Sequence, residues 1–276
     1  MYQDCVATVM SFTTHEMLPG VFHIQDAMGV SMTLLCGAER ALLVDTGYGL
    51  EDVAAHIRSL TDLLLTVVLT HGHHDHALGS RWFDRVLLLP EELPVWQTYT
   101  GERWRRHVLR GAADKGLAVD GESFLSAAMP EPGLITEPCF RLGGLTAEII
   151  PCPGHTPGSL VVFVPERGLL LTGDDWNPCT WLFFPEALPV AAYHTHVRGL
   201  LRLPFTHILC SHRERLYPRR MLEAFLDGLT DETLRLAQPS VEGEAVGVRT
   251  RTARLPEDQV LVFDADKAEV SYADCR

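Results

Sequence analysis

The chain has 276 residues, of which 46% are hydrophobic and 21% are charged, and its formal net charge at pH 7 is −13. This composition is typical of a globular protein with a substantial core, and the length allows one large α/β domain or two small ones. The negative charge disfavours a nucleic acid or an anionic membrane surface as partner, since both prefer a basic face. We expect a small-molecule substrate, and a homodimer is left open.

The sequence shows no sign of an export signal or a membrane anchor. Residues 1–5 lack a basic segment followed by an apolar one, and no apolar run reaches the roughly 20 residues of a membrane span. The seven Cys residues are scattered and include no Cys-x-x-Cys pair, which fits reduced thiols better than a disulfide framework. These features predict a cytoplasmic protein.

Short strands are predicted near the start of the chain, at residues 20–24 and 31–36. A third, at residues 40–47, ends in an Asp-Thr-Gly triplet that begins with Asp45. An Asp before a helix can cap its first turn, and a helix is expected at about residues 50–60. One interpretation of Asp45 is therefore a turn residue that caps this helix.

A continuous apolar run with β-branched members at residues 63–69 predicts a fully buried strand. Residues 70–76 then read Thr-His-Gly-His-His-Asp-His, which contains the pattern His-x-His-x-Asp-His. Ionisable side chains this dense repel one another and are costly to desolvate unless a cation lies among them. On a tight loop the first two imidazoles can point to one side, and Asp75 and His76 to the other, which suits two divalent ions. A surface loop without metal is the alternative, which the preceding strand disfavours.

This motif at a strand end resembles the defining motif of the metallo-β-lactamase superfamily. The resemblance implies that further ligands follow in a fixed order, each at the end of a strand. It also gives Asp45 a second interpretation, in which its carboxylate accepts a hydrogen bond beside the metal ligands. Ligating His residues commonly donate their second ring N–H to such a group. Both interpretations of Asp45 stand.

Residues 90–133 differ from the chain before them, which ends in a strand predicted at residues 86–89. Aromatic and basic side chains come close together, small and Pro- or Gly-rich positions follow, and no sheet pattern appears. We interpret the segment as a mostly helical insertion within a single domain that spans residues 1–276. The resemblance implies a lid over the metal cleft, although most of these aromatic residues are expected only to pin the insertion to the body.

A second motif follows a strand predicted at residues 145–150. Residues 151–159 read Pro-Cys-Pro-Gly-His-Thr-Pro-Gly-Ser, in which His155 is the only strong metal ligand. This stretch is nearly identical to the second motif of the superfamily.

A hairpin is predicted at residues 160–164 and 169–172, and its second strand leads into Gly-Asp-Asp. In relatives the Asp directly after this Gly bridges two metals, so the resemblance implies that role for Asp174. An apolar strand that begins at about residue 206 ends in His212, which the resemblance implies as the last ligand. Many relatives have Gly before this His, whereas this chain has Ser.

The rest of the chain shows no metal or nucleotide pattern. Helices are predicted at residues 188–203 and 218–229, and a strand-rich tail at residues 241–272, for instance at residues 246–249 and 259–263. Most Cys residues are expected to be ordinary surface or core residues, and Cys152 and Cys210 are expected to line the packed strand ends. The remaining imidazoles are expected to be ordinary surface or core residues: His15, His23, His56, His107, His194, His196 and His207.

The resemblance therefore implies a complete binuclear site. Its ligands are His71, His73 and His155 for one ion, Asp75, His76 and His212 for the other, and Asp174 between them. Zinc is the first expectation, with manganese or iron as alternatives. The resemblance also implies an α/β fold of four layers, an αββα sandwich with the metal cleft along one edge of two packed sheets. The sequence agrees, since buried strands alternate with amphipathic helices.

The inferred reaction is hydrolysis by a hydroxide that bridges the two ions, because divalent cations lower the pKa of water from about 15.7 to about 7. Asp75 is expected to orient the hydroxide or accept its proton. Tyr193 is expected to donate a hydrogen bond to the developing oxyanion if its helix faces the cleft. Four aromatic residues after Asp174 either form an apolar substrate wall or belong to the core: Trp176, Trp181, Phe183 and Phe184.

Departures from other branches of the superfamily narrow the expected substrate. The chain lacks the Cys ligand and export signal of the secreted zinc β-lactamases, the extra domain or basic arm of the nucleases, and the flavin domain of the diiron relatives. A small thioester, lactone or other ester is the remaining class, as in hydroxyacylglutathione hydrolases and acyl-homoserine lactonases. The alternatives are a mononuclear iron persulfide dioxygenase, a phosphodiester hydrolase, and a metal-binding sensor with little turnover.

Overall fold

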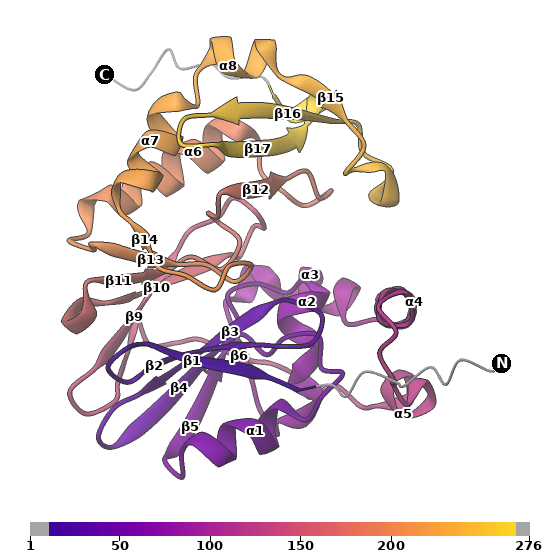
Figure 1. Ribbon diagram of the computed structural model, residues 1–276, viewed down its shortest axis with the longest axis vertical. Coiled ribbons are helices and arrows are strands. Elements are labelled where there is room, and N and C mark those ends of the chain that lie inside the picture. The colour runs from indigo at the N-terminus through magenta and orange to yellow at the C-terminus, as the bar shows by residue number, and fades with distance from the viewer. Residues whose placement is uncertain (1–10, 269–276) are drawn as a thin grey trace, which may run out of the picture. The chain divides into compact units, whose positions relative to one another are not determined.

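The computed structural model describes residues 11–268, which divide into two compact units (Figure 1). Unit 1 contains residues 11–136 and 141–145, and unit 2 contains residues 137–140 and 146–268. Residues 1–5, where an export signal would lie, and residues 269–272, at the end of the predicted tail, are outside this part. No helix within residues 11–268 is long and apolar enough to cross a membrane. The single domain stays a prediction.

Unit 1 is built on a seven-stranded sheet with the order β1-β2-β3-β4-β5-β6-β7. Strands β1 to β4 pair antiparallel, and β4 to β7 pair parallel. The strands are β1 (Thr13–Leu18), β2 (Val21–Gln25), β3 (Ser31–Cys36), β4 (Arg40–Val44), β5 (Leu64–Val68), β6 (Leu87–Leu88) and β7 (Gly133–Leu134). The apolar runs of β3 and β4 are almost wholly buried, as in strands covered on both faces.

The pairing of β4 with β5 brings two functional segments together. Val44 lies opposite Val68 in a parallel register. Because parallel strands end at the same edge of a sheet, Asp45 and the loop after Val68 leave the sheet side by side.

The helices of unit 1 are short. The first begins after Asp52, whose side chain accepts a hydrogen bond from Ala55 N at 2.9 Å, so the capping residue is Asp52 rather than Asp45. The helices are α1 (Val53–Leu60), α2 (His74–Ala77), η1 (Leu78–Trp82), η2 (Pro90–Glu92), α3 (Leu93–Tyr99), α4 (Glu102–Asp114) and α5 (Gly121–Ser126). Four of them lie within residues 90–133, for which a lid function stays a prediction.

Unit 2 contains two sheets, one of six strands with the order β14-β13-β11-β10-β9-β8 and one of four with the order β12-β17-β16-β15 (Figure 1). The first is formed by β8 (Cys139–Arg141), β9 (Thr146–Pro151), β10 (Leu160–Val164), β11 (Leu169–Leu171), β13 (His207–Leu209) and β14 (Tyr217–Pro218). The second is formed by β12 (Cys179–Leu182), β15 (Gln238–Ser240), β16 (Thr250–Leu255) and β17 (Gln259–Asp264). The predicted hairpin is present as β10 and β11.

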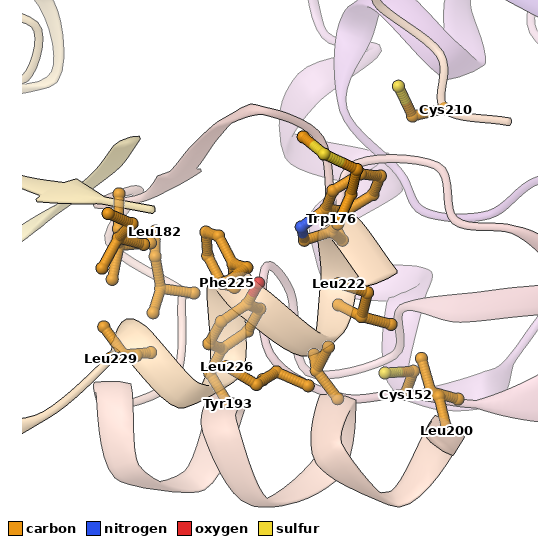
Figure 2. Close-up of a cluster of buried hydrophobic side chains, with 14 of the residues drawn as sticks. Cys152, Trp176, Leu182, Tyr193, Leu200, Cys210, Leu222, Phe225, Leu226 and Leu229 are labelled. Carbon is orange, nitrogen blue, oxygen red and sulfur yellow. The ribbon is translucent and has the colours of Figure 1, made fainter. Parts of the chain in front are cut away.

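An apolar core joins the helices of unit 2 to its strands. Figure 2 shows Trp176, Tyr193 and Phe225 within this core, all fully buried. The helices are α6 (Val190–Gly199), α7 (Arg220–Gly228) and α8 (Asp231–Leu236), with short turns η3 (Pro165–Arg167), η4 (Leu200–Arg202), η5 (Glu244–Val246) and η6 (Ala265–Lys267).

Some strand predictions need correction, as β1 and the start of β16 illustrate. Strand β1 was not expected, because its polar residues at positions 13–16 hide the alternation of an exposed edge strand. The strand expected at residues 246–249 is wrong. Gly247 adopts a φ of 75°, in the left-handed region, and closes η5, so the strand begins only at Thr250.

Candidate metal centre

Unit 1 places four ligand-type side chains together at the end of β5. His71 and His73 lie in the loop, and Asp75 and His76 lie on α2. The ring centroids of His71 and His73 are 4.7 Å apart, and those of His71 and His76 are 4.1 Å apart. The Nε2 atom of His76 lies 3.6 Å from Asp75 Oδ2. The three imidazoles are buried and Asp75 is half-buried.

Close backbone contacts fix this loop against β4. Thr46 N and Thr46 Oγ1 both donate to the carbonyl oxygen of His76, at 2.9 and 2.7 Å. A Cβ at Gly79 would lie only 1.9 Å from the carbonyl oxygen of Thr46, so a side chain there would push the two segments apart. The third residue after His76 therefore has to be glycine for α2 to reach β4.

The buried carboxylate of Asp45 accepts the hydrogen bonds that orient ligand-type side chains of unit 1. It accepts hydrogen bonds from Thr70 N at 2.7 Å, from Thr70 Oγ1 at 2.8 Å and from His76 Nδ1 at 2.9 Å. Thr70 Oγ1 lies 3.0 Å from His71 Nδ1. Because the Thr70 hydroxyl donates its proton to Asp45, it accepts from His71. The carboxylate thus orients two imidazoles, as in the second interpretation of this residue.

The helices after β6 contact the same loop from another side. Gly72 N donates to Glu92 Oε1 at 2.8 Å, and Glu92 is only 1% exposed. Tyr99 packs on His73 with ring centroids 4.3 Å apart, and Trp104 stacks on His74 at 4.7 Å. Burial lowers the pKa of His74 to about 4, so this imidazole is neutral at pH 7.

The role of Glu92 was not evident in the sequence. It follows Glu91 directly, and nothing in the order of residues distinguishes the buried carboxylate from its exposed neighbour. Only the path of the chain from η2 into α3 reveals it.

Unit 2 brings together the three ligands that the sequence predicts for it. Asp174 follows β11 and His212 follows β13, and these strands are parallel with Leu171 opposite Leu209. His212 Nε2 lies 3.1 Å from Asp174 Oδ2. His155, in the loop after β9, has its Nε2 atom 3.8 Å from the same oxygen. The parallel pairing of β11 and β13 therefore places Asp174 beside His212, and the loop of the second motif places His155 beside them.

The second ring nitrogen of His155 is also held. His155 Nδ1 donates to the carbonyl oxygen of Trp181 at 2.7 Å, and the backbone N of His155 donates to Asp175 Oδ1 at 3.4 Å. Asp175 is buried, whereas Asp174 is half-buried beside His212. Asp175 therefore supports the loop, and Asp174 has the position of a ligand.

These contacts are what a metal site requires. In His71, His76 and His155 the Nδ1–H is donated to an oxygen of the protein, so the lone pair available to a cation is on Nε2. Ligating His residues are normally oriented in this way. Imidazole and carboxylate donors suit Zn²⁺, Mn²⁺ and Fe²⁺. The donor sets of the two units therefore fit divalent cations.

Tyr193 does not have the position that the sequence analysis expected. Its side chain is 0% exposed, and its hydroxyl donates to the backbone carbonyl of Asp175 at 2.6 Å. Burial, followed by the nearby Asp175 carboxylate, raises the pKa of Tyr193 well above its ordinary value. The expectation of a hydrogen bond to an oxyanion is corrected, because this hydroxyl is already committed inside the core of unit 2 (Figure 2).

Other candidates from the sequence have structural roles. Trp176 is fully buried in the core of unit 2. Burial raises the pKa of Cys210 to about 12 and that of Cys152 well above its ordinary value, so both are neutral core thiols. Phe184 and Trp181 differ from these, since Phe184 packs edge-on against His155 and Trp181 is exposed.

Comparison with known proteins gives one family. The sequence profile of the metallo-beta-lactamase superfamily matches residues 26–175, just over half of the chain. Bos taurus acyl-coenzyme A thioesterase MBLAC2 is 26% identical over 202 residues, which cover 62% of this chain and 72% of the relative. Rhodobacter capsulatus hydroxyacylglutathione hydrolase is 28% identical over 150 residues, which cover 46% and 56%.

Solved structures show the same fold. The sec-alkylsulfatase Pisa1 from Pseudomonas sp. superposes with a TM-score of 0.62 at 17% identity, over 82% of this chain and 43% of that chain. This chain therefore spans less than half of the alkylsulfatase. The protein TTHA1623, solved in a di-iron-bound form, superposes with a TM-score of 0.52 at 25% identity, over 72% of this chain and 93% of that one.

Proposed function

Because the chain belongs to the metallo-β-lactamase superfamily, we propose that it is a binuclear metal-dependent hydrolase of thioesters. The observation that carries this proposal is the orientation of three imidazoles, in His71, His76 and His155, by oxygen acceptors of their own unit. A surface His cluster without metal would not need its Nδ1 atoms held in this way.

In the proposal His71, His73 and His155 bind one ion, and Asp75, His76 and His212 bind the other, as the order of the motifs predicts. In the proposal Asp174 serves both ions, since a carboxylate has two oxygens and can bind a cation with each. Zinc, iron and manganese all suit these donors, and the di-iron form of TTHA1623 makes iron a serious alternative to zinc.

When bound, the cations supply Lewis acidity and lower the pKa of water to about 7. The protein's own groups position the reaction. Asp75 is half-buried, so in the proposal its carboxylate orients the attacking water and accepts its proton. Asp45, directly and through Thr70, holds the imidazoles of His76 and His71 aligned.

The names of the relatives support a thioester as the substrate class. An acyl-coenzyme A and a hydroxyacylglutathione both carry an acyl group on sulfur, and these are the substrates that the two relatives are named for. The low identity leaves the exact acyl and thiol groups to experiment.

The first test combines metal analysis with a hydrolysis screen. Protein reconstituted with zinc, manganese or iron would be assayed with thioesters, lactones and phosphodiesters, with chelator and metal add-back. We expect two ions per chain and thioester cleavage that Asp174→Ala lowers at least ~100-fold. Asp62→Ala, a change at an exposed carboxylate that is not among the proposed ligands, is the matched control.

Two outcomes would overturn the proposal. One iron per chain with oxygen consumption on a persulfide would favour the dioxygenase alternative. Metal-loaded protein that cleaves phosphodiesters but no thioester would leave the metal site in place and reject the substrate class.

A further inference from the structure

Strand β12 presents one large aromatic side chain to solvent. Thr180 and Leu182 are 0% and 1% exposed, whereas Trp181 between them is 41% exposed. Since successive residues of a strand face opposite sides, Trp181 points away from the core that contains Leu182. The exposed indole is therefore available to contact a bound group.

Trp181 is one end of a continuous aromatic strip. Its ring lies 5.2 Å from that of Phe183, and Phe183 stacks on Phe184 with centroids 4.9 Å apart and planes 17° apart. Phe184 in turn packs edge-on against His155 at 5.7 Å. Phe183 is 1% exposed, so Trp181 and the half-buried Phe184 are the members of this strip that a ligand can reach. The strip therefore runs from solvent to an imidazole of the candidate metal centre.

The strip is also fixed in position relative to His155. The carbonyl oxygen of Trp181 accepts the Nδ1–H of His155 at 2.7 Å, so the residue that exposes the indole also orients the imidazole. The backbone of β12 is held in turn by its parallel pairing with β17, where Trp181 lies opposite Val262. A group bound on the strip would therefore have a defined distance from the Nε2 atom of His155.

We propose that Trp181 and Phe184, with the buried Phe183 packed between them, bind the apolar acyl chain of the substrate, which makes the preferred substrates thioesters of unbranched hydrophobic acids rather than of short hydroxyacids. This inference rests on the proposed function for its substrate class. A polar hydroxyacyl group would gain little from the apolar rings of Trp181 and Phe184, whereas each methylene in contact with them adds to binding.

The test uses acetyl, butyryl, hexanoyl, octanoyl and decanoyl thioesters of one thiol. With the metal-loaded wild type we expect kcat/KM to rise about two- to fourfold per added methylene until the strip is covered. Trp181→Ala and Phe184→Ala should flatten this rise, so that their loss grows with chain length. Trp181→Phe should restore part of it. Leu236→Ala is the matched control, because Leu236 is 62% exposed in the same unit but lies at the end of α8.

A second measurement does not depend on catalysis. Decyl thioether of the same thiol, which cannot be hydrolysed, would be titrated into metal-free protein by calorimetry. Trp181→Ala and Phe184→Ala should weaken its binding about tenfold, and Leu236→Ala should not. Equal binding by all variants would overturn the acyl subsite, even if thioesters are cleaved. Binding that follows the strip, without cleavage of any thioester, would reject the proposed function and leave the strip.

Discussion

Asp45 shows how much a single buried carboxylate can do here. It is 2% exposed, has a φ of 65° and is one of three non-glycine residues with positive φ within residues 11–268. Such a conformation costs on the order of 1–3 kcal/mol and persists only where surrounding contacts over-determine it. The hydrogen bonds from Thr70 and His76 supply those contacts, and they turn the strained residue toward the ligands.

Asp45→Asn is expected to weaken metal binding about 10- to 100-fold, because an amide nitrogen would face a group that now donates to a carboxylate oxygen. Competition with a chromogenic chelator would measure the affinity. Asp52→Asn is the control, since Asp52 is also an aspartate near this strand but only caps α1. Equal metal affinities of the two variants would show that Asp45 has no part in holding the ligands.

The residues of the site were predictable from the sequence to different degrees. The seven predicted ligands lie in short motifs directly after apolar strands, so their order along the chain was enough to propose them. Tyr193 was placed on the correct helix, but the sequence does not say which face of that helix meets the core, and its hydroxyl proved to bond Asp175. The role of Glu92 depends on a turn between elements, which no motif records.

At the scale of elements, two parallel strand pairs bring the residues of the candidate site side by side. The pair β4 and β5 sets Asp45 beside the loop of unit 1, and the pair β11 and β13 sets Asp174 beside His212. Continuous apolar runs made these strands predictable. Strand β1 has no such run and was not predicted. The apolar residues just before Thr250 suggested a strand that begins too early, because part of that segment forms η5.

The junction of η2 and α3 gives a prediction about loop stability. Glu92→Ala should lower the free energy of unfolding by about 1–3 kcal/mol, because the N–H of Gly72 would be left buried without this acceptor. Glu92→Gln should cost less, since its amide oxygen can still accept. Urea unfolding of the metal-loaded protein would measure both.

The adjacent Glu91 offers the control for this change. It is exposed, so Glu91→Ala should shift the unfolding free energy by less than about 0.5 kcal/mol. If both alanine variants unfold at the same urea concentration, Glu92 does not support the loop.

For the whole molecule, the sequence predicted the α/β fold and the family, and both are confirmed by the superfamily match and the superposed structures. The net charge of −13 agrees with a small-molecule substrate but says nothing of which one. The division into two compact units was not foreseen, because no composition shift or linker marks residues 137–145, where the chain passes between them.

The stability of the whole molecule should depend on pH through Asp26. Burial raises the pKa of this carboxyl from 3.8 to about 6, although backbone N–H groups of Tyr48, Val30 and Gly29 oppose the rise. Because the folded protein then holds the proton more tightly than the unfolded chain, the free energy of unfolding falls as the pH rises from about 4 to about 6. The loss attributable to Asp26 is about 3 kcal/mol, at the usual free energy per pKa unit.

Asp26→Asn removes this titration. Relative to wild type, the variant should gain about 3 kcal/mol between roughly pH 4 and pH 7. Urea unfolding of both proteins at the two ends of that range gives the comparison, in which other titrating groups cancel. A difference between the two proteins that stays constant with pH would contradict the assigned cause.

Strand β12 sits at the edge of its sheet and pairs there with β17, some 80 residues further along the chain. The carbonyl oxygen of Trp181, which accepts from His155 Nδ1, therefore lies on a strand whose partner, β17, is synthesised in full only at residue Asp264. During synthesis on the ribosome, all seven proposed ligands emerge before β17, the strand that holds the segment bonded to His155. A nascent chain stalled between His212 and Gln259 would carry every proposed donor and still lack the strand that pairs with β12, so the proposed metal site would be completed only in the last stage of its biogenesis.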